Sequence, residues 1–359
     1  MPRCSALYNH EFISIDGTRL PCCRFIDLKS EYTANNSSIS EYHNSDFIRN
    51  IKQDMETGWH PGCNRCKVEE EAGQDSLRNL YNLDHSFSDN IESIEFSLSN
   101  KCNLVCRMCN PVYSTKWQSF LLDNPELKDY VGSSKEFNPV LFDKVFKNRD
   151  LSNLKFIKYL GGEPFITPEI AQLFKLLDEQ NLLPNINFFC STNATLFPSK
   201  YIKYLKKFKF IRMDISLEGT NGLNEYIRHG KPWSNILSTL NLWKEYKEKN
   251  NNIDLSIFTT IQAYNIHDIN NLMQLSNTLQ IGFRGALLSK PRWLSLNSLP
   301  PAYVNTLSKV SQEYFKDYQF NEIDFHKLKD YTNKFDKSSN MYMKDIIPEL
   351  WKEMQNAKL

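Results

Sequence analysis

The chain has 359 residues, of which 41% are hydrophobic and 24% charged, a balance that is ordinary for a globular protein and excludes disorder of the whole chain. This length predicts roughly two domains at about 150 residues each. Lysine and arginine total 43 against 42 acidic residues, so no overall charge favours binding to nucleic acid or to an anionic membrane.

The sequence carries no targeting or membrane-spanning signal. The first residues, "MPRCSALYNHEF", lack the apolar segment of a signal peptide, and no apolar stretch reaches 18 residues. We therefore expect a cytoplasmic protein that does not act at a membrane. Nine cysteines in such a chain are more often metal ligands or free thiols than disulfide partners.

Residues 1 to 85 are rich in turn-forming sequences such as "IDGTRLP" and "GWHPGC". Five cysteines occur in this part: Cys4, Cys22, Cys23, Cys63 and Cys66. Four thiols are enough to close a metal site, and a C-x2-C pair such as "CNRC" binds zinc or iron readily. We predict a small domain at residues 1–88 that is stabilised by a metal site.

From residue 91 onward, short apolar strands alternate with helical stretches. Strands are expected within residues 91–99, 154–160, 185–192, 208–217, 253–261 and 281–289, and helices at 165–180, 198–207 and 234–249. This alternation predicts an α/β fold with a parallel sheet, in which reactive side chains lie at the carboxyl ends of the strands. After about residue 290 the sequence becomes helical and shows no strand pattern.

The stretch "LSNKCNLVCRMCN" ends the first predicted strand and contains Cys102, Cys106 and Cys109. An iron-sulfur cluster held by three cysteines has one iron without a protein ligand, which leaves a coordination position open for a substrate or cofactor. A structural zinc site is the alternative for three cysteines taken alone. The spacing C-x3-C-x2-C resembles the signature of the radical S-adenosylmethionine (SAM) enzymes, in which the amino and carboxylate groups of SAM chelate the open iron of a [4Fe-4S] cluster.

A second segment, "LGGEPFITPEI", resembles the family's glycine-glycine-glutamate-proline motif, which binds the SAM amino group. Gly161 and Gly162 allow close approach of the backbone. The resemblance implies that Glu163 supplies the carboxylate for the SAM ammonium, and Pro164 ends the strand. A simple turn between strand and helix is the alternative.

The third and fourth predicted strands end in "CSTNAT" and "ISLEGTNGLNEYIRHG", which are similar to further family segments. The match implies that Asn193 and Ser216 contact the ribose or carboxylate of SAM, and that Arg228 pairs with the carboxylate. Asn193 also fits an ordinary turn. Two residues depart from the family: Glu218 stands where Asp is usual, and Met108 stands where an aromatic residue is usual, although its backbone is still expected at the adenine edge.

The fifth predicted strand ends in "TTIQAYNIHDI", where Gln262 and Asn265 either face the same cavity or pack at the edge of the core. Neither reading is favoured by the sequence.

The cysteines of the first 85 residues resemble an auxiliary-cluster module of the Twitch or SPASM type. Cys4 is followed by twelve residues, Gly17, four residues and Cys22, and the C-x2-C pair is Cys63 and Cys66. The match to Twitch implies one auxiliary [4Fe-4S] cluster on these four cysteines. Zinc and the use of Cys23 in place of Cys22 stay open as alternatives. Such modules usually follow the barrel, whereas here the module precedes it.

The resemblance therefore implies a partial (β/α)6 TIM-like radical SAM barrel at residues 89–290, preceded by the auxiliary domain and followed by a helical extension at 291–359. It implies reductive cleavage of SAM and hydrogen abstraction from a substrate C–H bond, with an electron donor such as flavodoxin or ferredoxin. A peptide or protein is the first expected substrate, and a small metabolite, sugar or nucleotide derivative is the alternative. An iron-sulfur redox sensor or electron carrier is the non-enzymatic alternative.

Overall fold

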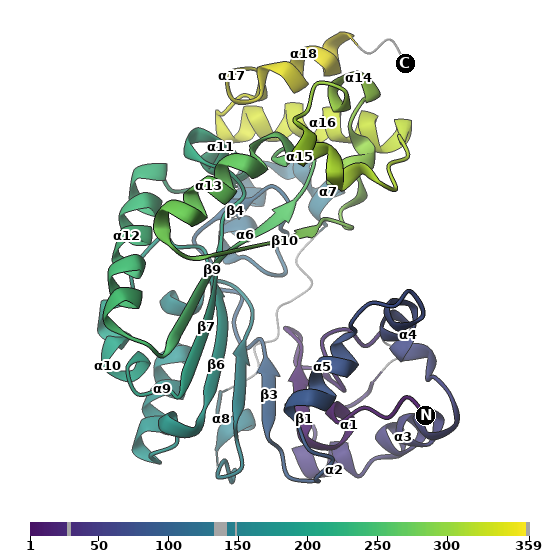
Figure 1. The fold of residues 1–359 in the computed structure, drawn as a ribbon, viewed down its shortest axis with the longest axis vertical. Coiled ribbons are helices and arrows are strands. Elements are labelled where there is room, and N and C mark those ends of the chain that lie inside the picture. Colours follow the sequence, from purple (N-terminus) through teal and green to yellow (C-terminus); the bar gives the residue numbers. More distant parts are fainter. Residues whose placement is uncertain (27–29, 133–141, 148, 357–359) are drawn as a thin grey trace. The chain divides into compact units, whose positions relative to one another are not determined.

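The computed structural model describes residues 1–26, 30–132, 142–147 and 149–356 (Figure 1). The chain divides into two compact units. The first unit comprises residues 1–100, 136–190 and 200–212, and the second comprises 101–135, 191–199 and 213–359. The three domain ranges given above stay a prediction. None of the described helices is long and apolar enough to cross a membrane.

The first unit contains a mostly parallel sheet. Strands β3 (Ser93–Phe96), β5 (Phe156–Tyr159) and β6 (Asn187–Thr192) are parallel neighbours in that order. Strand β1 (His10–Ile13) adds to the other side of β3, also in parallel, and β2 (Arg19–Leu20) pairs antiparallel with β1. The first residues of the chain therefore extend the sheet, which the sequence did not indicate.

Helix α9 (Pro168–Glu179) packs on this sheet through one apolar stripe. Its buried residues recur at helical spacing: Ile170, Leu173, Phe174 and Leu177. Phe174 meets Phe188 of β6 with ring centroids 5.2 Å apart. The proline at the first helical position and Glu169 in the first turn favour a helix start at this point.

A second apolar cluster of the first unit lies among its N-terminal helices. These are α1 (Ala6–Asn9), α2 (Ile39–His43), α3 (Asp46–Thr57), α4 (Asn64–Glu71) and α5 (Leu77–Asp84). The cluster consists of Leu7, Phe25, Tyr42, Ile48, Ile51 and Met55, and three cysteines pack against it, namely Cys4, Cys22 and Cys63. Ser45 caps α3 by accepting a hydrogen bond from the Ile48 amide.

The second unit contains most of β7 (Phe210–Ser216) together with β9 (Ile253–Ile261) and β10 (Gly282–Leu287), in the order β7-β9-β10. Strands β9 and β10 are parallel, and helices α12 (Trp233–Lys249) and α13 (Ile269–Leu279) pack along β9 (Figure 1). A separate pair, β4 (Val105–Cys106) and β8 (Arg228–His229), is antiparallel. Shorter helices of this unit are α6 (Thr115–Asp123), α7 (Lys128–Val131) and α11 (Asn221–Ile227).

The remaining helices belong to the C-terminal extension, apart from α8 (Phe142–Phe146) and α10 (Ile202–Leu205) of the first unit. The extension contains α14 (Pro301–Val304), α15 (Lys309–Gln312), α16 (Glu322–Ser339), α17 (Met343–Ile346) and α18 (Pro348–Asn356). The helical character predicted for this part is confirmed. The six predicted strands are confirmed as β3, β5, β6, β7, β9 and β10.

Candidate functional site

The loop of residues 102–109 brings three thiols together in the second unit. Burial raises the pKa of Cys109 to about 11, and the nearby Cys102 contributes to the increase. Burial also raises the pKa of Cys106, and both other thiols add to it. Three thiolates this close would repel one another, so the loop needs a positive charge at its centre to hold them deprotonated.

Side chains from other parts of the second unit hold the backbone of this loop. Four carbonyl groups each accept a side-chain hydrogen bond: Cys102 O from Thr115 Oγ1 (3.3 Å), Leu104 O from Ser114 Oγ (2.9 Å), Cys106 O from Trp117 Nε1 (2.9 Å) and Arg107 O from the Tyr331 hydroxyl (2.7 Å). The Cys109 amide also donates to Cys106 O at 2.9 Å. Side-chain hydrogen bonds therefore hold the loop from its start to its middle, and a bond within the loop closes the turn at Cys109.

Arg228 lies directly opposite Cys106 in the β4–β8 pair. Its Nη1 donates to Glu218 Oε1 at 3.0 Å, and its buried Nε has no hydrogen-bond partner within the described chain. Burial would lower the pKa of Arg228, but attraction to Cys106, Glu218 and Cys102 outweighs it and raises the pKa above its ordinary value. The guanidinium is thus a permanent cation beside the thiols, with one donor available to a ligand.

Glu218 is buried and holds several groups of this site together. Its Oε2 accepts hydrogen bonds from the Thr260 amide (2.8 Å) and from Asn265 Nδ2 (3.5 Å). Burial raises its pKa to about 7, although Arg228 opposes the increase. Asn265, at the end of β9, therefore belongs to the Arg228–Glu218 network. Gln262 is also buried, and its Oε1 has no partner within the described chain.

Asn193 follows β6 and contacts the cysteine loop. Its Nδ2 donates to Asn103 Oδ1 at 2.9 Å and lies 3.9 Å from the Cys102 sulfur, while its Oδ1 accepts from the Thr195 amide at 3.0 Å. Ser216 is the last residue of β7 and is partly exposed. Met108 is also partly exposed. The structure thus brings Asn193 and Arg228 to the three thiols.

The Gly161–Pro164 segment belongs to the first unit and follows β5. Gly161 has φ +94°, and a Cβ there would lie 2.4 Å from both Ser97 Oγ and Ser99 O, so only glycine fits. The Gly162 amide donates to Ser99 O at 3.2 Å. Glu163 is buried and caps the short 3-10 helix Pro164–Ile166, where its Oε1 accepts from the Phe165 amide at 3.4 Å.

A sequence model of the radical SAM superfamily matches residues 96–275, which is half of the chain. The chain belongs to the radical SAM superfamily. The matched range contains the cysteine loop, the Gly161–Pro164 segment, Asn193, Ser216 and Arg228, so the family expected from these motifs is confirmed.

The relatives of this radical SAM protein cover only part of it. It is 26% identical over 203 residues to the radical SAM cyclopropyl synthase TigE of Paramaledivibacter caminithermalis, a match that spans 54% of this chain and 41% of TigE. It is 28% identical over 130 residues to a GTP 3',8-cyclase of Clostridium acetobutylicum, spanning 36% of this chain and 35% of the cyclase. The chain thus spans less than half the length of these relatives.

Two solved structures match part of the chain. Native anSMEcpe with bound AdoMet has a TM-score of 0.43 at 19% identity, covering 63% of this chain and 61% of that one. SuiB of Streptococcus suis bound to the precursor peptide SuiA has a TM-score of 0.34 at 18% identity, covering 77% of this chain and 59% of SuiB.

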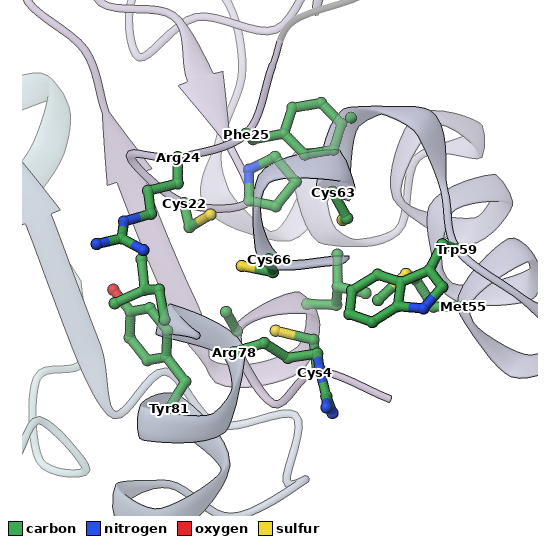
Figure 2. Close-up of a pocket in the computed structure, with 15 residues that line it drawn as sticks. Cys4, Cys22, Arg24, Phe25, Met55, Trp59, Cys63, Cys66, Arg78 and Tyr81 are labelled. Atoms are coloured by element: carbon green, nitrogen blue, oxygen red, sulfur yellow. The ribbon is translucent and has the colours of Figure 1, made fainter. Parts of the chain in front are cut away.

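Outside the matched range, the radical SAM protein has a second group of thiols in its first unit. Cys4, Cys22, Cys63 and Cys66 line one pocket, whose other walls include Phe25, Met55, Trp59, Arg78 and Tyr81 (Figure 2). Burial and the nearby Cys66 raise the pKa of Cys4 to about 11, and burial with Cys4 and Cys66 raises that of Cys63 to about 12. Cys4 is therefore close to Cys63 and Cys66, and Cys22 is close to Cys4 and Cys63.

Cys23 does not line this pocket. The pKa of Cys23 is raised to about 12 because its sulfur is partly withdrawn from water and because the negative charge of Glu95 is nearby. Glu95 is in turn paired with Lys158 at 2.7 Å. Of the two adjacent cysteines, Cys22 is the one that shares a pocket with Cys4, Cys63 and Cys66.

A single bound metal ion would need its thiol ligands close to one another. A zinc ion would draw its sulfur ligands to about 4 Å from one another, because Zn–S bonds are about 2.3 Å long. Across the described ranges, no three His, Cys, Asp or Glu side chains converge closely enough to hold one metal ion.

Two features of the site did not follow from the motifs. One is the pairing of Arg228 with Glu218, for which the only signal was a carboxylate two residues beyond Ser216. The other is the support of the cysteine loop by Tyr331, more than two hundred residues further along the chain. Arg107, the charged residue inside the loop, is buried in the structure and so needs a partner, but nothing in the sequence marks it as buried.

Proposed function

We propose that this protein is an enzyme that reductively cleaves SAM and abstracts a hydrogen atom from a substrate C–H bond. The observation that carries the proposal is the group of three thiols, Cys102, Cys106 and Cys109, with the Arg228 guanidinium beside them and a donor of that guanidinium unpartnered. When bound, a [4Fe-4S] cluster supplies the electron that splits SAM into methionine and a 5'-deoxyadenosyl radical. Three thiol ligands leave one iron open for SAM.

The chain's own residues would bind and orient SAM. Arg228 pairs with the carboxylate, since its buried Nε has a donor to offer. Glu163, presented by the tight turn at Gly161 and Gly162 and fixed by Pro164, takes the ammonium group. Asn193 and Ser216 take the ribose or carboxylate. The backbone of Met108 takes the adenine edge.

We further propose an auxiliary [4Fe-4S] cluster on Cys4, Cys22, Cys63 and Cys66. The shared pocket of these four thiols supports it, as does the orientation of Cys23 toward Glu95 instead. The cluster would accept the electron left on the substrate or bind the substrate directly. The domain ranges 1–88, 89–290 and 291–359, a cytoplasmic location and a flavodoxin or ferredoxin as electron donor belong to the same proposal.

The first proposed substrate is a peptide or protein, because auxiliary clusters of this kind accompany many peptide-modifying members of the family. The second is a small metabolite or nucleotide derivative, and the relative named GTP 3',8-cyclase favours it. Assays of SAM cleavage with a peptide library and with a nucleotide panel separate the two. The substrate class is the one whose addition gives a modified product and not 5'-deoxyadenosine alone.

The function is tested by anaerobic reconstitution with iron and sulfide, followed by a SAM cleavage assay with dithionite. We expect close to eight irons per chain, about four at each site as in a [4Fe-4S] cluster. Replacing Cys102, Cys106 and Cys109 together by alanine should remove about half of the iron and all 5'-deoxyadenosine formation. An eight-iron protein that neither binds nor cleaves SAM would instead be an electron carrier or redox sensor.

A further inference from the structure

Arg107 lies inside the cysteine loop, between Cys106 and Cys109, and its side chain is fully buried. The guanidinium stacks over Tyr226, with 3.6 Å from Cζ to the ring centroid, and lies 4.2 Å from the centroid of Phe335. Its Nε donates to the Tyr226 carbonyl at 2.7 Å. A buried guanidinium is costly unless it is paired. The identity of its charge partner therefore decides how firmly the loop is held.

That partner is Asp336, which comes from helix α16 of the C-terminal extension. Asp336 Oδ1 accepts from Arg107 Nη2 at 2.8 Å and from the Tyr226 hydroxyl at 2.8 Å, and Oδ2 accepts from the Met343 amide at 2.6 Å. Every contact is made within the second unit. The carboxylate therefore joins the cysteine loop, α11 and the start of α17.

One turn earlier on α16, Tyr331 reaches the loop backbone. Its hydroxyl donates to the Arg107 carbonyl at 2.7 Å, and its ring is fully buried near Cys106 and Cys109. Phe335, on the same helix face, packs edge-on against Trp117 with centroids 5.6 Å apart. Trp117 in turn donates to the Cys106 carbonyl. Helix α16 therefore holds the Arg107 carbonyl directly and the Cys106 carbonyl through Trp117.

We infer that α16 supports the proposed SAM site, with Tyr331 and Asp336 acting as positioning residues for the Cys106–Cys109 turn. This inference rests on the proposed function, because it assigns the two residues to the loop that would carry the cluster. Tyr331 and Asp336 would act through the loop and not as ligands of SAM or iron. They hold the Arg107 carbonyl and side chain, and through them the thiols of Cys106 and Cys109 and the Met108 backbone that we propose binds the adenine edge.

The contacts separate this role from plain core packing. An apolar helix face would bury the same area without a carboxylate, and such a replacement is often as stable as a buried ion pair. The hydroxyl and carboxylate of α16 instead form directed bonds to the backbone and side chain of a single loop residue. Directed bonds fix a position, whereas apolar contacts tolerate small shifts.

The test compares Tyr331→Phe and Asp336→Asn with wild type and with Tyr303→Phe, which changes a buried tyrosine of α14 in the same extension. Each protein is reconstituted anaerobically. Iron content, melting temperature, SAM dissociation constant and the EPR spectrum of the reduced cluster with and without SAM are then measured. We expect Tyr331→Phe to weaken SAM binding roughly two- to tenfold, the range for loss of one hydrogen bond.

The EPR spectrum is the readout that a purely structural role would not change. We expect the SAM-induced spectral shift to be altered in Tyr331→Phe and Asp336→Asn at unchanged iron content, and to match wild type in Tyr303→Phe. If wild type binds SAM and Tyr331→Phe gives the same dissociation constant and spectrum, the inference is wrong even when Asp336→Asn does not fold. If wild type itself binds neither cluster nor SAM, the proposed function fails first.

Discussion

The Glu218→Gln substitution tests whether burial of this carboxyl makes the protein less stable as the pH rises. Glu218 is 1% exposed, and its pKa is raised from 4.5 to about 7. Between these two values the native carboxyl keeps a proton that the unfolded chain has already lost. The free energy of unfolding should therefore fall as the pH increases from 4.5 through 7.

The size of this effect follows from the shift. Each unit of pKa difference corresponds to about 1.4 kcal/mol, so a shift of roughly 2.5 units amounts to about 3 kcal/mol lost by pH 7.5. Glutamine has the shape of the protonated acid and does not titrate. Its amide replaces one acceptor oxygen by a donor at a cost that does not depend on pH. The stability of Glu218→Gln relative to wild type should therefore rise by about 3 kcal/mol between pH 4.5 and pH 7.5.

The assay is urea unfolding of metal-free protein, followed by tryptophan fluorescence at several pH values between 4.5 and 7.5. The quantity of interest is the difference in unfolding free energy between wild type and variant, because titrations common to both proteins cancel. Glu248→Gln, which removes an exposed carboxyl on α12, is the matched control. A difference that stays constant across this pH range would refute the argument that Glu218 is held protonated by burial.

Three further changes separate the roles assigned to individual residues. Arg228→Met and Glu163→Gln should each weaken SAM binding by roughly 2 to 5 kcal/mol, the range for truncating one member of a buried charge pair. The iron content should not change. Calorimetric affinities equal to wild type would remove both residues from the site. A Cys63→Ala, Cys66→Ala variant should still form 5'-deoxyadenosine but no product, and loss of all SAM cleavage in folded protein would show that the two cysteine groups cannot act separately. Arg78→Met should lower the midpoint potential of the auxiliary cluster, because this cation lines its pocket and stabilises the reduced form; an EPR-monitored redox titration with an unchanged potential would count against it.

Strands β3, β5 and β6 of the parallel sheet were predictable because each contains a short apolar run with buried residues. Ile94, Ile157 and Phe188 lie at matching positions of β3, β5 and β6, and all three are fully buried. Such runs carry their own signal, whatever their neighbours are. The observed strands are shorter than the predicted ranges at several ends, since hydrogen bonding and not hydrophobicity sets where a strand stops.

The position of β1 was not predictable in the same way. "HEFI" contains two titratable residues and only two apolar ones, which is a weak strand pattern. Glu11 is nevertheless buried, because Arg19 and Arg149 both pair with it. Arg149 follows Glu11 by 138 residues. Only the folded chain brings these charges together, so a strand stabilised by them leaves no local trace in the sequence.

The residues of the candidate site also fall into those that the sequence identified and those that it did not. The cysteines, the Gly161–Pro164 turn and Arg228 were found because spacing and residue type reflect the chemistry that they serve. The groups that hold them are charged or hydroxyl side chains at ordinary positions, such as Glu218 two residues beyond a strand and Tyr331 in the middle of a helix. Their role depends on a partner and not on a pattern.

Asp336 shows why such partners cannot be read from the sequence. It belongs to a helix rich in charged residues, where an aspartate is ordinarily solvated, yet it is 3% exposed and bonds a guanidinium 229 residues earlier. With 43 cationic and 42 acidic side chains in the chain, nothing local selects this pair from the many that are conceivable. Burial selects it, since a charge withdrawn from water is tolerated only beside its complement. Arg107, next to Cys106 in the sequence, is therefore completed by an acid that only the fold identifies.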